Sequence, residues 1–147
     1  MSQLVLGAPP HLSDPSGRGH VWFTDPPGIV DRFTTPAVDA GLVDWLIGPV
    51  TAALRARFPK ARWGFLHDWR SVQTYDIRAR PKLVAWGLEL GKPRVARVTI
   101  VIEREAPALL RMACQAGVVP FAIAGIPMEV RHDFDEQVAK LGLRLAR

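Results

Sequence analysis

One stretch of the chain decides the fold, residues 65–78, which read FLHDWRSVQTYDIR. It begins with a strand-like apolar run that ends at His67-Asp68, and a second acidic residue, Asp76, follows after a turn. An aspartate at this place can accept hydrogen bonds from the unpaired backbone amides at the start of a helix. The pattern predicts a buried strand, an acidic turn and then a helix, which is the repeating unit of an α/β sheet.

The chain on either side of this stretch repeats the alternation of strand and helix. Runs of apolar and β-branched residues predict a hairpin at 21–24 and 29–33 and further strands at 62–67, 97–102 and 128–132. Apolar residues at three- and four-residue steps predict helices at 36–60, 77–90, 105–116 and 133–143. Thr35-Pro36 has the composition of a helix start. A proline inside a helix costs about 3 kcal/mol, so we expect Gly48-Pro49 to kink or divide the first helix.

This order predicts an α/β fold with a mostly parallel or mixed sheet of about four to six strands, covered by about four helices. Residues 1–19 are rich in Pro, Gly and Ser and show no periodicity, so we expect a flexible N-terminal arm. Residues 20–147 are expected to form a single domain. A chain of 147 residues can bury about two thirds of the surface that its unfolded form exposes.

The composition is that of a globular protein from a reducing compartment. Hydrophobic residues make up 48% of the chain and charged residues 22%, which excludes wholesale disorder. Cys114 is the single cysteine, so no internal disulfide can form. The N-terminus does not have the pattern of a signal peptide, and the apolar stretch at 113–128 is too short and too broken by Gly and Pro to span a bilayer. We therefore expect a soluble cytoplasmic protein.

The net charge of +5 is unevenly placed. Residues 1–53 carry two basic and five acidic side chains, whereas residues 54–147 carry seventeen and nine. A basic half is compatible with an anionic partner. However, fifteen of the nineteen basic residues are Arg, and Ala, Gly and Pro are plentiful, which is typical of a GC-rich genome. The charge therefore gives little support to nucleic-acid binding.

In the order of their elements, residues 20–143 resemble the STAS fold of SpoIIAA-type anti-sigma factor antagonists. In that family a strand ending in an acidic residue leads through a short hydrophobic turn to a motif of Asp, two hydroxyl residues and Gly. Here Leu66-His67-Asp68 matches the strand end, Val72 the turn and Asp76 the motif aspartate. The resemblance implies a bacterial signalling module in which a kinase phosphorylates the second hydroxyl and the following helix binds the partner.

The chain departs from the family at the switch itself, because Ile77, Arg78 and Ala79 occupy the hydroxyl, hydroxyl and glycine positions. The guanidinium of Arg78 cannot accept a phosphoryl group. We therefore expect a non-enzymatic signalling or scaffolding module that binds a partner protein without serine phosphorylation and without a cofactor. Lipid-binding SEC14-like proteins share this architecture without the serine, and the chain is similar to those too. The partner-binding residues that the resemblance implies are Trp69, Arg70, Tyr75, Asp76, Arg78 and Lys82.

A second interpretation is a module that binds a nucleotide or another small anion. Arg70, Arg78 and Arg80 cluster around the predicted helix start, and positive charges beside helix amides can hold a phosphate. The simpler interpretation is a solvated basic surface.

A third interpretation is an enzyme or metal site made by two His-Asp pairs. His67-Asp68 and His132-Asp133 each end a predicted strand, and the carboxyl ends of parallel strands share the edge where α/β sheets bind ligands. Imidazoles and carboxylates can bind a metal or transfer protons. The simpler interpretation is that the aspartates cap loops or helices. No hydrolase, nucleotide-loop or zinc motif is present in the sequence, and we expect Cys114 to be a small buried hydrophobe.

The segment at 117–127 is unusually apolar for a connection between a helix and a strand. If it is exposed, Val118–Ile126 could be a surface for a partner or for self-association into a homo-oligomer. The alternative is that it packs under the last helix. In the helix before it, the apolar positions Leu109, Leu110, Ala113 and Cys114 are expected to face inward.

Overall fold

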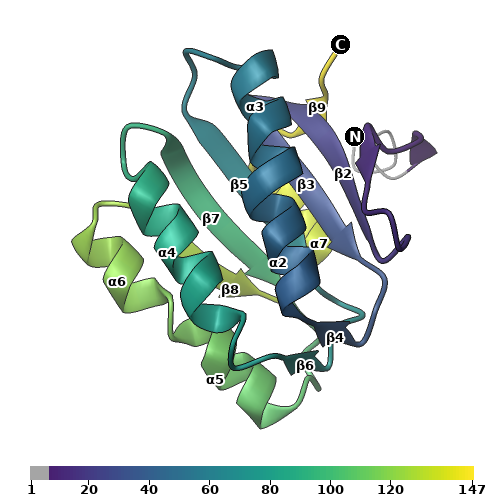
Figure 1. The fold of residues 1–147 in the computed structure, drawn as a ribbon, viewed down its shortest axis with the longest axis vertical. Helices are drawn as coiled ribbons and strands as arrows, with labels where there is room; N and C mark the ends of the chain where they lie inside the picture. The colour runs from purple at the N-terminus through teal and green to yellow at the C-terminus, as the bar shows by residue number, and fades with distance from the viewer. Residues whose placement is uncertain (1–6) are drawn as a thin grey trace.

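The computed structural model describes residues 7–147, and a seven-stranded sheet forms its centre (Figure 1). The strands of this sheet are β1 (Leu12–Ser13), β2 (Gly19–Asp25), β3 (Gly28–Phe33), β5 (Trp63–Asp68), β7 (Val95–Val101), β8 (Met128–Arg131) and β9 (Arg144–Leu145). Their order is β1-β2-β3-β5-β7-β8, and β9 pairs with the end of β2. β2 is antiparallel to its neighbours, while β3, β5, β7 and β8 are parallel. The predicted α/β fold with a mostly parallel, mixed sheet is confirmed.

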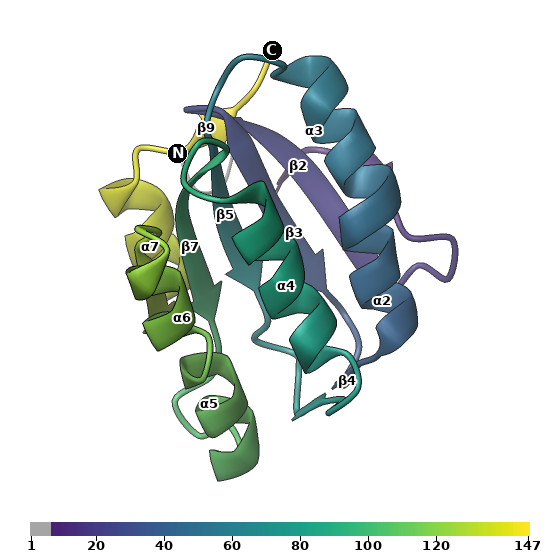
Figure 2. The same cartoon turned by 60° about the vertical axis from the view of Figure 1, so that its left-hand side comes forward.

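Helices cover both faces of the sheet, unequally. They are α2 (Ala40–Trp45), the π-helical turn η1 (Leu46–Val50), α3 (Thr51–Arg57), α4 (Arg80–Leu90), α5 (Ala108–Gln115), α6 (Val118–Ile123) and α7 (Phe134–Lys140). We call the face under α2, α3 and α4 the front face, because it faces the viewer in Figure 1. The opposite, back face carries α7 (Figures 1 and 2). A second small sheet joins β4 (Ala37–Val38) to β6 (Thr74–Tyr75).

The side chains of strand β5 alternate between the two faces of the sheet. Successive side chains of a strand point to opposite faces, so Phe65 belongs to the large front core and Leu66 to the small back core. The back core consists of Trp22, Val30, Leu66, Val101, Phe134, Val138 and Leu143. All six residues of β5 are buried, as expected for a central strand covered on both sides.

The first helical segment starts later than the sequence predicts and continues past its proline. Thr35-Pro36 does not open the helix, because the next two residues pair as β4 with β6. Asp39 is the cap instead, and its carboxylate accepts a hydrogen bond from the Leu42 amide at 3.0 Å. The missing amide of Pro49 is accommodated by η1, a π-helical turn, so the helix is not divided at the position where a kink or a division was expected.

Residues 7–19 belong to the folded domain and do not form a loose arm. β1 pairs with β2, and the indole of Trp22 donates a hydrogen bond to the Ala8 carbonyl at 2.9 Å. The backbone amide of Phe23 donates to the ring of His11 at 3.0 Å. Residues 1–6 of the expected arm lie outside the described residues.

The apolar segment at 117–127 contains a helix that the sequence analysis did not predict. Pro120 lies in the first turn of α6, where no backbone amide is needed, so the helix tolerates it. Phe121 is buried against α4 at Gly87, where a Cβ atom would come within 2.5 Å of the Phe121 ring. Val119 and Ile123, one helical turn apart, are 65% and 84% exposed. Among residues 7–147, no helix has the length and apolar character needed to cross a membrane.

Candidate functional site

A buried aspartate–histidine pair joins the two central strands on the front face. Asp31 of β3 lies directly opposite His67 of β5 in the parallel register. The Nδ1 atom of His67 lies 2.5 Å from Oδ1 of Asp31, and the two side chains are 3% and 0% exposed. The other oxygen, Oδ2, has no hydrogen-bond partner within residues 7–147. Buried polar groups normally have hydrogen-bond partners, so a buried carboxylate with one unpaired oxygen makes this part of the sheet a candidate functional site.

Aromatic rings surround this pair and keep its environment apolar. The imidazole of His67 stacks on Phe65 with ring centroids 6.0 Å apart and lies 6.0 Å from Trp69 on its other side. Tyr75 packs edge-on against Trp69 at 5.0 Å. A continuous aromatic row therefore runs from Phe65 along the front face to β6.

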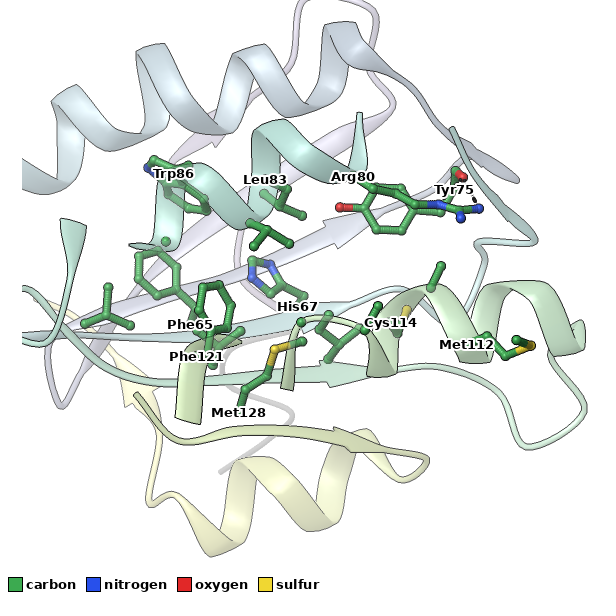
Figure 3. Close-up of a pocket in the computed structure, with 18 of the residues that line it drawn as sticks. Phe65, His67, Tyr75, Arg80, Leu83, Trp86, Met112, Cys114, Phe121 and Met128 are labelled. Atoms are coloured by element: carbon green, nitrogen blue, oxygen red, sulfur yellow. Dashed lines mark hydrogen bonds between the residues drawn. The ribbon is translucent and has the colours of Figure 1, made fainter. Parts of the chain in front are cut away.

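The imidazole of His67 lies at the floor of a pocket between the front face and α4, α5 and α6 (Figure 3). The pocket has a volume of about 320 Å³. Most of its lining is aliphatic, aromatic or sulfur-containing, and includes Phe65, Leu83, Trp86, Met112, Phe121 and Met128. We call this site the front pocket.

Three polar side chains, His67, Tyr75 and Arg80, interrupt the apolar lining of the front pocket. Nδ1 of His67 is taken by Asp31, while Nε2 has no hydrogen-bond partner among the described residues and is not fully enclosed. Figure 3 shows the hydroxyl of Tyr75 pointing into the pocket and the guanidinium of Arg80 beside the Tyr75 carbonyl. Nε and Nη2 of Arg80 donate to that carbonyl at 3.0 and 2.8 Å.

Burial changes the acidity of two groups in the front pocket. It raises the pKa of the Cys114 thiol to about 12, against the opposing effect of the Arg80 charge. It also raises the pKa of the Tyr75 phenol, which Arg80 again opposes. The thiol therefore stays protonated near neutral pH, as expected for a buried hydrophobe and not for a nucleophile.

The mouth of the front pocket carries exposed apolar side chains of α5. Leu109 and Met112 line the pocket and are 75% and 67% exposed. The expectation that Leu109 faces the core was wrong. Helix α5 lies at the edge of the fold, so only its residues Leu110 and Cys114, one turn apart, are buried against the sheet side.

Asp68, the residue after His67, belongs to a different cluster on the back face. Its carboxylate accepts hydrogen bonds from Arg32 at 2.7 Å and from Arg70 at 2.8 Å. The guanidinium of Arg70 also lies 4.8 Å from the ring centroid of Phe134 in α7. Burial acts to raise the pKa of Asp68, but the bonds from Arg70 and Arg32 outweigh it and hold this pKa below its usual value. We call this group the back cluster.

The two His-Asp pairs of the sequence therefore do not form one site. Asp68 lies opposite Val101 and Val101 opposite Arg131, so the strand ends are two strand spacings, or about 10 Å, apart. Asp133 caps α7 by accepting from the Glu136 amide at 3.0 Å, and Nδ1 of His132 is 3.1 Å from the Ile102 carbonyl. Within the described part of the chain, no three His, Cys, Asp or Glu side chains are grouped to hold a metal ion.

The arginines proposed for an anion site also lie apart. Arg70 is bound to Asp68 on the back face, whereas Arg80 lines the front pocket. Arg78 is exposed, and its backbone amide is bound to the carboxylate of Asp76. The three guanidinium groups therefore do not face one common site.

The predicted partner surface is smaller than the sequence suggested. Trp69 is 0% and Tyr75 6% exposed, because both pack in the front core, so neither side chain is available to a partner in this state. Asp76, Arg78 and Lys82 are exposed, and Arg70 is half-buried. The ammonium group of Lys82 lies 3.3 Å from the carboxylate of Asp44. Whether these four bind a partner stays a prediction.

The fold has a counterpart of known structure. A protein from Shewanella loihica, described as an uncharacterized protein of the DUF3478 family with a SpoIIAA-like fold, matches with a TM-score of 0.56 and 14% identity. The match covers 78% of this chain and 83% of that chain. The chain has a SpoIIAA-like fold. The resemblance drawn from the order of elements is confirmed, while an identity this low shows the SpoIIAA-like architecture alone. No family model and no curated protein sequence matches the chain.

Sequence reasoning missed Asp31 and with it the front pocket. One signal was available, because Asp31 interrupts the apolar strand at 29–33 and is followed by Arg32. A charge in the middle of a buried strand requires a partner. The identity of that partner depends on the register of two strands, and the two residues lie 36 positions apart in sequence.

Proposed function

We propose that this SpoIIAA-like chain is a binding module whose front pocket holds a small, largely apolar molecule. The observation that carries the proposal is the pocket itself, which is lined mainly by apolar side chains and has a few polar groups in its lining. Its volume of about 320 Å³ lies at the lower end of the range of roughly 300–1,000 Å³ for small-molecule sites.

The volume limits the size of the molecule. An apolar cavity of about 150 Å³ holds benzene, which has six heavy atoms. At the same ratio, about 320 Å³ has room for roughly a dozen heavy atoms. The exposed side chains of Leu109 and Met112 at the mouth would extend the apolar contact toward the surface.

Decanol is a suitable neutral probe, because its size matches the pocket. At a free concentration of about one hundred times Kd, binding to the native state adds about 2.7 kcal/mol, which raises Tm by about 5–10 °C in a domain of this size. In Ala113→Trp, an indole at a half-buried lining position should fill the pocket and abolish the shift. Ala56→Trp places the same side chain on an exposed position of α3, outside the pocket, and its Tm should still rise when decanol is added. An equal shift in all three proteins, or none in the wild type, would reject this function.

A second candidate, binding of another protein or of a second copy of the chain, is favoured by the exposed apolar side chains of α6. Val119 and Ile123 are 65% and 84% exposed on one side of the helix, and compact monomers seldom leave such groups together on their surface. Light scattering after size-exclusion chromatography tests self-association: a dimer that dissociates in Val119→Lys/Ile123→Lys supports it. A wild type that stays monomeric at high concentration counts against it.

A further inference from the structure

The front pocket has a charge pattern as well as an apolar shape. Among the described residues, its lining includes one guanidinium and one imidazole but no carboxylate. Asp31, the acidic group of the buried pair, is not part of the lining, since it lies behind the ring of His67 in the neighbouring strand. A ligand in the pocket therefore meets Arg80, His67 and Tyr75 before it meets any negative charge.

The buried pair fixes which atom of His67 the ligand meets. Asp31 binds Nδ1 at 2.5 Å, so the imidazole cannot turn without losing that contact. Stacking on Phe65 with an interplanar angle of 16° holds the ring in the same orientation. Nε2 is left as the free nitrogen at the floor of the pocket, where it can form a hydrogen bond with a ligand.

Arg80 supplies a positive charge that no side chain neutralises. Its contacts are the Tyr75 carbonyl and the Tyr75 ring, whose centroid lies 5.6 Å from the guanidinium carbon. Within residues 7–147 it forms no ion pair, unlike Arg32 and Arg70 of the back cluster. Nε and Nη2 of Arg80 already donate to the Tyr75 carbonyl, so the remaining N–H groups of Nη1 and Nη2 are the ones that can bind a carboxylate.

We propose that the front pocket selects an amphipathic carboxylate, with an apolar body of about ten carbon atoms against α4, α5 and α6 and its carboxylate toward Arg80 and Tyr75. This inference rests on the proposed function, because it assigns a headgroup to the ligand of the same pocket. The apolar lining provides most of the contact area, and Arg80 and Tyr75, which can donate hydrogen bonds, distinguish a carboxylate from an alcohol or an amine.

Three ten-carbon probes separate the headgroup from the chain: decanoate, decanol and decylamine. Calorimetric titration of the full chain at neutral pH, below the concentration at which each probe forms micelles, gives the three affinities. We expect decanoate to bind at least about tenfold more tightly than decanol, because only the carboxylate forms a charge-assisted hydrogen bond with Arg80, and we expect decylamine to bind most weakly because its charge is repelled.

Variants assign the selectivity to residues. Arg80→Gln should lower decanoate affinity to about that of decanol while decanol affinity stays the same, which also shows that the pocket is still folded. Tyr75→Phe removes a hydroxyl that has no hydrogen-bond partner among the described residues. We expect it to lower the affinity for decanoate by less than Arg80→Gln does, and to leave the affinity for decanol unchanged. Arg78→Gln is the matched control, since Arg78 is exposed and does not line the pocket.

The outcomes separate the two proposals. If decanol binds as tightly as decanoate and Ala113→Trp abolishes both, the pocket is an apolar site and the carboxylate inference is overturned. If decanoate is preferred but Arg80→Gln and Arg78→Gln weaken it equally, the charge acts from the surface and the assignment to Arg80 is wrong. If none of the three probes binds, the proposed function itself fails.

Discussion

His67 and Asp68 are neighbours in β5, yet they belong to two regions with opposite properties. On the front face, His67 is bound to one partner and leaves a ring nitrogen free in an apolar pocket. On the back face, Asp68 is bound by two arginines, so its carboxylate is satisfied at both oxygens. The front pair has unused hydrogen-bonding capacity and the back cluster has little, which is the distinction expected between a binding site and a structural ion-pair cluster.

The largest effect should come from breaking the front pair. His67→Phe leaves the buried carboxylate of Asp31 without its only side-chain partner among the described residues, which should lower the free energy of unfolding by about 3–5 kcal/mol. Urea denaturation at neutral pH measures the loss. The double variant Asp31→Val/His67→Phe removes both polar groups and should recover most of it. A loss below about 1 kcal/mol in the single variant would contradict this view of the pair.

A smaller effect, with a pH signature, is expected from the back cluster. Asp68→Asn should cost about 1–3 kcal/mol at neutral pH, because the bonds from Arg32 and Arg70 lose their charge on one side. The folded-state pKa of Asp68 is lowered, so its contribution is complete above the unfolded value of about 4 and is lost as the pH falls below it. Urea denaturation of the wild type and of Asp68→Asn between pH 7 and pH 3 should show that the difference between their free energies of unfolding becomes smaller as the pH falls. A difference in free energy of unfolding that does not change with pH would mean that the charge of Asp68 does not stabilise the fold.

The smallest effect should come from Tyr75→Phe. The Tyr75 hydroxyl has no hydrogen-bond partner among the described residues, so stability at neutral pH should change by less than about 0.5 kcal/mol. Burial raises the pKa of this phenol in the folded state, so the wild type should lose stability relative to the variant as the pH rises above the unfolded value of about 10. Thermal melting between pH 8 and pH 11 measures this difference, and parallel curves would show that the phenol titrates freely.

The same comparison shows what the sequence can and cannot predict. The alternation of side chains along β5 and the helix after Asp76 follow from local patterns, and they were enough to predict the α/β order and its resemblance to the STAS fold. The pairing of Asp31 with His67 depends on which strands become neighbours, and the exposure of Leu109 depends on where α5 lies on the sheet. Local patterns do not contain either fact. Asp133 was recognisable as a helix cap because capping is a local interaction.

The central claim, that the front pocket is the ligand site, can be tested by following two tryptophans in one NMR titration. Trp86 lines the front pocket and Trp22 lies in the back core, and each has an indole N–H with a single described acceptor. On addition of decanoate, we predict a saturable shift of the Trp86 indole signal with an unchanged Trp22 signal, and loss of that shift in Ala113→Trp. Equal shifts at both tryptophans, or a Trp86 signal that does not respond to decanoate or decanol, would contradict the account.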